Sequence, residues 1–406
     1  MRAAVGPWLA ANARVVFLAA LCGWLVEGVL FLLGPIGPLV SDMGSYWATG
    51  TADMRTHLLG TYWPPLYPLL TVPFHRAGGP GALAAVQTVV AVAMVVGVGW
   101  YLLRTQGMRA AALFMAAMAA FPLPLLYARF VLTDDWLMLL LLAWVVLAEG
   151  AERTGRTILF LAGGICLGVG AGVRPEFVAV GALATLWLAL RGRWWPAAWT
   201  LAPIAAEALG FAAYSWITTG VLVGSQQGLW GSLWEGNNPK ALGFYSGVGP
   251  ANAVPAVYRH LFLQWFSAHP LHYVLLCLAR AVEFWFSSPG YIQPLAVRTH
   301  LVPLAWLVLA WPDTVVTTAV FFVALLRLYR QGGPRQITWA LIAVGANWLF
   351  SVPFLVAGRF REDVLPLMLV VSAVAFGTSA RAASPAEPMG LPSGGRGTSP
   401  HSPTAG

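Results

Sequence analysis

Charge is what this sequence has least of. Only 9% of its 406 residues are Asp, Glu, Lys or Arg, whereas 59% are hydrophobic and the mean hydropathy is +0.72. A soluble domain carries about 25% charged residues and about 45–50% apolar ones. The shortage of charge therefore excludes an ordinary soluble domain and indicates an integral membrane protein, whose domain count does not follow from its length.

Cysteine and lysine are also scarce. The cysteines are Cys22, Cys166 and Cys277, each in an apolar run and without metal-like spacing, so no disulfide framework is implied. The basic residues are 22 arginines and one lysine, Lys240, and the formal net charge is +8. Because the arginines fall between apolar runs, membrane topology explains the excess better than a nucleic-acid partner does.

Nucleotide and zinc motifs are missing as well. No Gly-x-Gly-x-x-Gly, Walker loop or Ser nucleophile elbow is present, which argues against a nucleotide-driven pump. The seven histidines form no zinc pattern; the closest pair, His269 and His272, lacks the H-E-x-x-H context.

Long apolar runs are what the sequence has in abundance. A transmembrane helix needs about 20 mostly apolar residues, and the runs predict an all-α, polytopic transmembrane bundle of about ten spans: 14–34, 82–103, 108–126, 131–148, 157–173, 176–190, 196–218, 303–328, 337–357 and 363–379. This domain covers 1–379, with outer loops at 35–81 and 219–302. The first run lacks a cleavage site and is predicted to be a retained span. The Pro/Gly/Ser-rich tail 380–406 is predicted to be disordered.

Arginine placement predicts the orientation of these spans. The arginines at 2, 14, 104, 109, 153, 156, 191, 193, 327, 330 and 335 fall on one side in regular alternation, which marks that side as cytoplasmic. Both termini are then cytoplasmic, in an inner or plasma membrane. The run 271–288 lies on the outer side with Arg280 and Glu283 at its centre, and is predicted to be an interfacial or re-entrant helix.

Four arginines depart from this rule, because they lie in very short outer turns: Arg129, Arg174, Arg359 and Arg361. The planar guanidinium suits a phosphate, so a shared lipid-phosphate site is one explanation. Snorkelling to anionic headgroups, or pairing with an acid such as Asp134, Glu176 or Asp363, is the other.

Acidic residues gather on the same outer side. Asp42 follows the first span in a Ser-Asp-x-x-x-Tyr context, where it is either a turn residue or a functional carboxylate. Asp134 and Asp135 follow Thr133 at the start of the fourth span. They either complement a helix N-terminus or bind a divalent cation or a substrate amine or hydroxyl.

Aromatic and amide side chains are dense in the long outer segment, from Leu229 to Tyr245. Its Gly-Asn-Asn-Pro sequence, Gly236 to Pro239, is typical of a tight turn. The same composition would also suit a sugar ring, which needs flat apolar faces together with hydrogen-bonding groups.

Taken in order, these segments resemble the GT-C membrane glycosyltransferases, in particular the bacterial branch related to protein O-mannosyltransferases and lipid A aminoarabinose transferases. The matching motifs run along most of the chain: Asp42 and Tyr46, Trp63 to Pro68, Asp134 and Asp135, Gly170 to Pro175, Trp234 to Gly243, His269 with Arg280 and Trp285, and Gly358 to Pro366. The ordered set is specific for the superfamily and not for a substrate. Many relatives have Asp-Glu in the first loop, whereas here Met43 follows Asp42.

The resemblance implies transfer of a mannose-like or other sugar, with inversion, from a polyprenyl-phosphate donor to a glycan, lipid or protein acceptor at the outer membrane face. It implies a general base at Asp42, and metal or acceptor binding at Asp134 and Asp135. The remaining implied residues are donor-phosphate ligands (Arg174, Arg359 and Arg361) and a substrate loop (Tyr46, Trp234, Asn237 and Asn238). A divalent cation is the one candidate cofactor. The rival functions are a lipid or small-solute transporter without catalysis and a non-catalytic scaffold.

Overall fold

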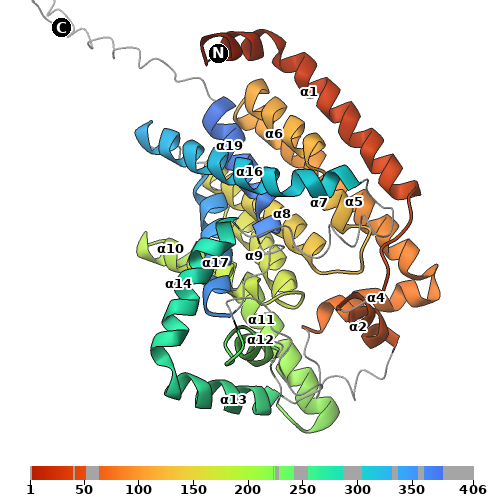
Figure 1. Cartoon of the computed structure of the whole chain (residues 1–406), viewed down its shortest axis with the longest axis vertical. Helices are drawn as coiled ribbons and strands as arrows, with labels where there is room; N and C mark the ends of the chain where they lie inside the picture. The colour runs from red at the N-terminus through yellow and green to blue at the C-terminus, as the bar shows by residue number, and fades with distance from the viewer. Residues whose placement is uncertain are drawn as a thin grey trace, which may run out of the picture.

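Helices are the regular elements of the chain wherever the structure describes it. The computed structural model describes residues 2–39, 42–51, 64–222, 224, 228–241, 255–286, 304–331, 337–354 and 361–377, and within these ranges the regular elements are helices without any strand (Figure 1). The all-α prediction is confirmed for this part of the chain. Trp63, Arg359 and the tail 380–406 lie outside the described residues.

The helices are, in chain order, α1 (Arg2–Leu33), α2 (Asp42–Thr51), α4 (Leu66–Arg76), α5 (Gly79–Thr105), α6 (Met108–Ala120), α7 (Leu123–Tyr127), α8 (Asp134–Thr154), α9 (Ile158–Ala171), α10 (Glu176–Leu190), α11 (Trp194–Thr219), α12 (Leu229–Gly236), α13 (Pro255–Ala268), α14 (Pro270–Phe286), α16 (Leu304–Arg330), α17 (Thr338–Phe354) and α19 (Leu365–Gly377). Each predicted span overlaps one of these helices along most of its length. The glycines after α8 and α11, Gly155 and Gly220, have φ of 68° and 72°, the left-handed conformation that commonly ends a helix.

Membrane-crossing length is established for fewer segments than the ten predicted. Among the described residues, two helices are long and apolar enough to span a bilayer, Ala11–Leu33 and Gly79–Thr105. The α13–α14 pair, bent by 104° at its junction, would make a third if it forms one broken span. Several other apolar helices are shorter than 18 residues, below the ~20 residues that a span needs. The chain is thus a helical bundle with membrane-spanning elements, and ten spans are not confirmed.

A central group of helices is wrapped by peripheral ones. α19 is buried along almost its whole length and packs on α6, α16 and α17. In Figure 1 it lies near α8 and α16, while α1 runs along the outside of the molecule. α1 presents a row of exposed apolar side chains, among them Val26, Leu30 and Leu33. An apolar outer surface of this kind matches hydrocarbon and not water.

The contact of α9 with α11 depends on glycines. Gly164 and Gly168 of α9 face the backbone of α11, where an added Cβ would lie 2.6 Å from the carbonyl oxygens of Trp199 and Pro203, respectively. Small residues let two helix backbones approach closely, which is how helices gain packing energy in a membrane. The two helices are therefore held by close backbone packing.

The first outer loop is fixed to the bundle by polar contacts. Arg129 donates hydrogen bonds to the carbonyl oxygens of Gly34 (2.5 Å) and Pro35 (3.3 Å), and its own carbonyl accepts from the N–H of Gly37 (2.7 Å). Of the four arginines in outer turns, Arg129 is thus held by backbone carbonyl oxygens.

The bent pair α13–α14 forms an angular arm beside the main bundle (Figure 1). Its inner surface packs with α12 in a second apolar cluster of Trp234, Tyr258, Phe262, Trp265 and Leu276. The outer surface of α14 exposes apolar side chains that lie on one face of the helix: Leu271, Val274, Leu275, Leu278 and Val282. Arg280 is fully buried on the opposite side, so its charge does not face lipid.

We predict that Gly168→Ala lowers the unfolding temperature in detergent. The new Cβ would lie 2.6 Å from the Pro203 carbonyl oxygen, which belongs to a backbone that cannot move freely. Overpacking of this kind costs about 1–3 kcal/mol. Gly210→Ala is the control, because its Cβ would have no neighbour within 4 Å; equal unfolding temperatures for the two variants would contradict the prediction.

Candidate active site

Buried polar side chains, most of them acidic, meet in the interior at one end of the bundle. They come from the end of α7, the start of α8, the turn between α9 and α10 with the first residue of α10, and the residues before α19. The members of this cluster are Tyr127, Asp134, Asp135, Arg174, Glu176, Glu362 and Asp363, and each is less than 7% exposed. The name "carboxylate cluster" is used for this set below.

Arg174 lies at the centre of the carboxylate cluster. One of its nitrogens is 3.0 Å from Asp134 and 3.6 Å from Asp363, and another is 2.7 Å from Glu176. Burial by itself would lower the pKa of Arg174, but Glu176, Asp134 and Asp363 hold that pKa well above its usual value. The guanidinium is therefore a permanent cation that links α8, α10 and the residues before α19. These partners are the ones that the pairing explanation for the outer arginines names.

Tyr127 joins the carboxylate cluster through its hydroxyl, which donates a short hydrogen bond to Glu362. Burial, with the charges of Glu362, Asp134 and Asp363, raises the pKa of Tyr127 well above its ordinary value. The phenol consequently stays protonated and acts as a donor to Glu362.

Asp135 differs from Asp134, Glu176 and Asp363 because those three carboxylates form ion pairs with Arg174. Its side chain is fully buried, and neither carboxylate oxygen has a hydrogen-bond partner among the described residues. A buried polar group without a partner is costly, so such a group usually has a missing partner or a function. The structure thus singles out Asp135 from the Asp134–Asp135 pair as the carboxyl group able to receive an additional partner.

The first outer loop adjoins the carboxylate cluster through two tyrosines. The rings of Tyr46 on α2 and Tyr67 on α4 meet edge to face at 5.1 Å. Burial, with Tyr46, Asp135 and Asp134 nearby, raises the pKa of Tyr67 well above its ordinary value. The Tyr67 hydroxyl donates to Gln87 Oε1 at 3.2 Å, and Gln87 Nε2 donates to the carbonyl oxygens of Ala128 and Phe130.

Asp42 lies on α2, the helix that also carries Tyr46. It is the first residue of α2 and lies partly buried, one turn before Tyr46. Side chains four residues apart lie on one face of a helix, so Asp42 and Tyr46 share a face of α2. Of the two explanations for Asp42, a turn residue or a functional carboxylate, the turn does not apply, because this residue begins a helix.

Arg361 is buried against α16. Its Nε donates to Thr318 Oγ1 at 3.0 Å, and a terminal nitrogen donates to the Thr314 carbonyl oxygen at 2.9 Å and to Thr317 Oγ1. The threonine face of α16 therefore fixes the position of this guanidinium. Glu362 and Asp363 of the carboxylate cluster are the next two residues of the chain. Arg359 lies outside the described residues.

The predicted substrate loop is placed near the end of α17. Asn237 is fully buried; its amide donates to the carbonyl oxygens of Leu233 (2.7 Å) and Pro353 (3.0 Å), and its Oδ1 accepts from Arg280 at 2.7 Å. Asn238 is likewise buried and donates to the carbonyl oxygens of Trp234 and Glu235. The tight-turn explanation for Gly-Asn-Asn-Pro is thus realised, with both amides binding backbone.

A divalent cation does not fit the carboxylate cluster as it stands. No three or more His, Cys, Asp or Glu side chains in the described ranges are grouped so that they could hold a metal ion. The cation that meets Asp134, Glu176 and Asp363 is the guanidinium of Arg174. We therefore derive no step through a metal.

Sequence reasoning missed part of this arrangement. Glu362 and Tyr127 belong to the carboxylate cluster, and Tyr67 with Gln87 connects it to the first loop. The signal for Glu362 was its position between Arg361 and Asp363, a run of three charges beside an apolar span. Tyr67 lies within the Trp63 to Pro68 motif, but nothing in the sequence distinguishes Gln87 or Tyr127 from the other polar residues that flank apolar runs.

Comparison with known proteins finds a distant likeness to solved structures. No protein-family model matches the chain, and neither does any curated protein sequence. Among solved structures, the chain is similar to the archaeal oligosaccharyltransferase AglB from Archaeoglobus fulgidus in complex with an inhibitory peptide and a dolichol-phosphate. The TM-score is 0.49 and the identity 15%, over 91% of this chain and 50% of AglB. This chain spans about half the length of that protein, and a likeness of this degree assigns no activity.

We predict that Arg174→Gln strongly destabilises the protein. Removing the cation leaves Asp134, Glu176 and Asp363 as buried charges without their partner, a loss that costs about 3–5 kcal/mol. The matched control is Arg193→Gln, because Arg193 and Glu152 form an ion pair with side chains 31% and 28% exposed, worth about 0–1 kcal/mol. Thermal unfolding in detergent measures both, and an Arg174→Gln transition within a degree of the control contradicts the assignment.

Proposed function

We propose that the protein is a membrane glycosyltransferase of the GT-C type, which transfers a sugar from a polyprenyl-phosphate donor to an acceptor hydroxyl at the outer membrane face. The observation that carries the proposal is the meeting of Asp42's helix with the carboxylate cluster, through Tyr46 and Tyr67. A glycosyl transfer needs one group to take a proton and others to stabilise a leaving phosphate, and this end of the bundle offers both kinds of group.

Asp42 is the proposed general base. Its carboxylate takes the proton of the acceptor hydroxyl while the acceptor oxygen forms a bond to the anomeric carbon. The bond from that carbon to the donor's phosphate oxygen breaks, and the lipid phosphate leaves with the electron pair. Attack opposite the leaving group gives inversion. Partial burial at the start of α2 keeps the Asp42 side chain within reach of a substrate.

The donor's phosphate is assigned to the arginines near 360. Arg361 and Arg359 would stabilise the negative charge that develops on the leaving phosphate. The support for Arg361 is its buried position on the threonines of α16, which pre-orients the guanidinium. Arg174 was proposed for the same role on the basis of sequence, and it contributes only when one of its three carboxylates releases it.

The acceptor is assigned to Asp135. A hydroxyl or amine of the acceptor would satisfy the carboxylate oxygens that lack hydrogen bonds. Asp134 then has a positioning role, because Arg174 holds it at 3.0 Å. Trp234, Asn237 and Asn238 would shape the cover over the sugar, with the two amides fixing the backbone of that cover.

The identity of the sugar and acceptor is left at the level of chemical class. The donor sugar is proposed to be a mannose-like or other hexose or pentose, and the acceptor a glycan, lipid or protein. The orientation, with the active site outside and both termini cytoplasmic, is proposed from the arginine distribution alone.

We predict that Asp42→Asn reduces sugar transfer by about 10²–10⁴-fold, the usual contribution of a general base. Purified protein is incubated with labelled polyprenyl-phosphate sugars and acceptors, and lipid-phosphate release is measured. The fold is expected to stay intact, because Asn keeps the shape of Asp. Glu152→Gln is the control, because Glu152 lies near the end of α8 that is farther from the carboxylate cluster. Near-normal turnover of Asp42→Asn would refute the base assignment.

The release assay, together with a measurement of lipid movement across vesicle membranes, separates the rival functions. Movement of lipid across vesicle membranes without lipid-phosphate release would point to a transporter. Neither release nor movement, with any donor tested, would point to a scaffold that keeps the fold without catalysis.

We predict that Arg359→Gln lowers the rate of transfer by about 10²–10³-fold, the loss typical of removing one donor to a developing anion. The unfolding temperature is measured alongside, and should stay at the wild-type value if the residue acts on the donor phosphate. The double variant with Arg361→Gln tests whether both contact one phosphate, because their losses would then not add. Normal rates in all of these variants would exclude the phosphate role.

A further inference from the structure

Glu149 is a second buried acid, far from the carboxylate cluster. It lies on α8, fifteen residues after Asp134, which corresponds to about 22 Å along a helix. Its side chain is only 3% exposed. The proposed transfer reaction does not use it, and the predicted span 131–148 ends just before it, at the end of the bundle opposite the site.

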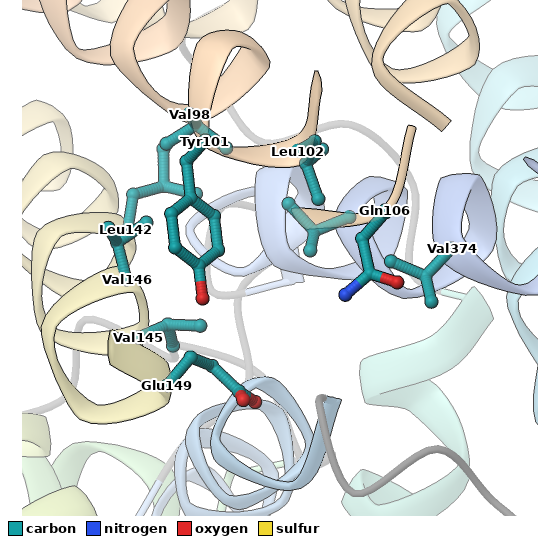
Figure 2. Close-up of a pocket in the computed structure, with 10 residues that line it drawn as sticks. Val98, Tyr101, Leu102, Gln106, Leu142, Val145, Val146, Glu149 and Val374 are labelled. Carbon is teal, nitrogen blue, oxygen red and sulfur yellow. The ribbon is translucent and has the colours of Figure 1, made fainter. Parts of the chain in front are cut away.

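A small cavity lies next to Glu149, among α5, α8 and α19. Its lining is apolar except for three side chains, Tyr101, Gln106 and Glu149 (Figure 2). The other lining residues are Val98, Leu102, Leu142, Val145, Val146, Val370 and Val374. In Figure 2 the Tyr101 hydroxyl points toward the Glu149 carboxyl group, and the Gln106 amide lies to the right of both, near Val374.

Two of these polar groups lack partners. The Tyr101 hydroxyl and Glu149 Oε1 are both buried, and neither has a hydrogen-bond partner in the described part of the chain. The backbone N–H of Trp339, at the start of α17, favours the ionised form of Glu149 and so opposes the effect of burial. Leaving two buried polar atoms without hydrogen bonds is costly, and a water molecule with several polar partners is the usual remedy.

The charged neighbours do not neutralise Glu149 by a direct bond. On α8, Arg153 attracts its charge and Glu152 repels it. Arg153 stacks on the ring of Tyr101, 5.9 Å from the ring centre, and Glu152 pairs with Arg193. From α5 and α19 the cavity receives Tyr101, Gln106 and valines, none of which carries a positive charge. An ionised carboxylate would be poorly compensated here, because burial in an apolar lining favours the neutral form.

We propose that this cavity is a proton-binding site: the Glu149 carboxyl carries a proton at neutral pH, and water in the cavity joins it to the Tyr101 hydroxyl and the Gln106 amide. The protonated carboxyl supplies the donor that the water or the Tyr101 oxygen accepts, so both unpartnered atoms gain hydrogen bonds. A metal cation is the less suitable ligand, since the described residues around Glu149 do not form a group of three metal-binding side chains.

Infrared spectroscopy of the full-length protein in detergent tests the proposal. At pH 7 the wild-type spectrum should contain the C=O stretching band of a protonated carboxyl that Glu149→Gln lacks. A solvent-exposed Glu, whose pKa is about 4.3, is ionised at that pH. Glu152→Gln is the matched control on the same helix and should keep the band. A Glu149→Gln spectrum that retains the full wild-type band would overturn the proposal.

Two further variants test the charge state of Glu149 and its link to Tyr101. Glu149→Gln resembles the neutral acid in shape and charge, so it should keep the wild-type unfolding temperature; loss of the fold would show that the ionised form is required and would overturn the proposal. Tyr101→Phe should shift the Glu149 band to a higher frequency, because the carboxyl loses part of its hydrogen bonding. A band at the wild-type frequency would overturn the proposal that water joins the Glu149 carboxyl to the Tyr101 hydroxyl.

Discussion

The buried ion-pair network around Arg174 is the constraint on which the polar end of the bundle depends. Three carboxylates approach one guanidinium within 3.6 Å in an interior from which water is excluded. Each group alone would be unfavourable there, and only their mutual compensation permits the burial. Since the groups come from α8, α10 and the residues before α19, the network also fixes these segments relative to one another.

The same requirement explains the other buried polar groups. Arg280 lies in an apolar helix, and it meets the Asn237 side chain together with the carbonyl oxygens of Gly236 and Val352. Arg361 meets the threonines of α16 in the same way. In an apolar environment every polar group needs an internal partner, so the arginines set where loops close onto helices. Asp135 and Glu149 are two of the exceptions among the described residues, since each has a buried oxygen without a hydrogen bond. These two are the places where a ligand or a proton is proposed.

The proposed chemistry follows from this division of roles. A rigid network positions the end of the bundle, while α2 brings Asp42 to its edge through the contact of Tyr46 with Tyr67. A base at the edge can meet an acceptor, whereas the buried acids keep the surrounding electrostatics fixed before the substrate arrives. Such preorganisation lowers the energy of the transition state without reorganisation during the reaction.

The sequence by itself determined that this is an apolar helical protein and where its helices lie, because composition and long apolar runs are local properties. It also indicated that Asp42, Asp134, Asp135 and the outer arginines are unusual. Only the tertiary structure decided which residues far apart in the sequence meet: Tyr127 with Glu362, Asn237 with Arg280, and Tyr67 with Gln87. Partners 20 to 235 residues apart are chosen by helix packing, and no local pattern encodes that choice. Span length, too, depended on where each helix ends, which packing and capping decide more than hydropathy does.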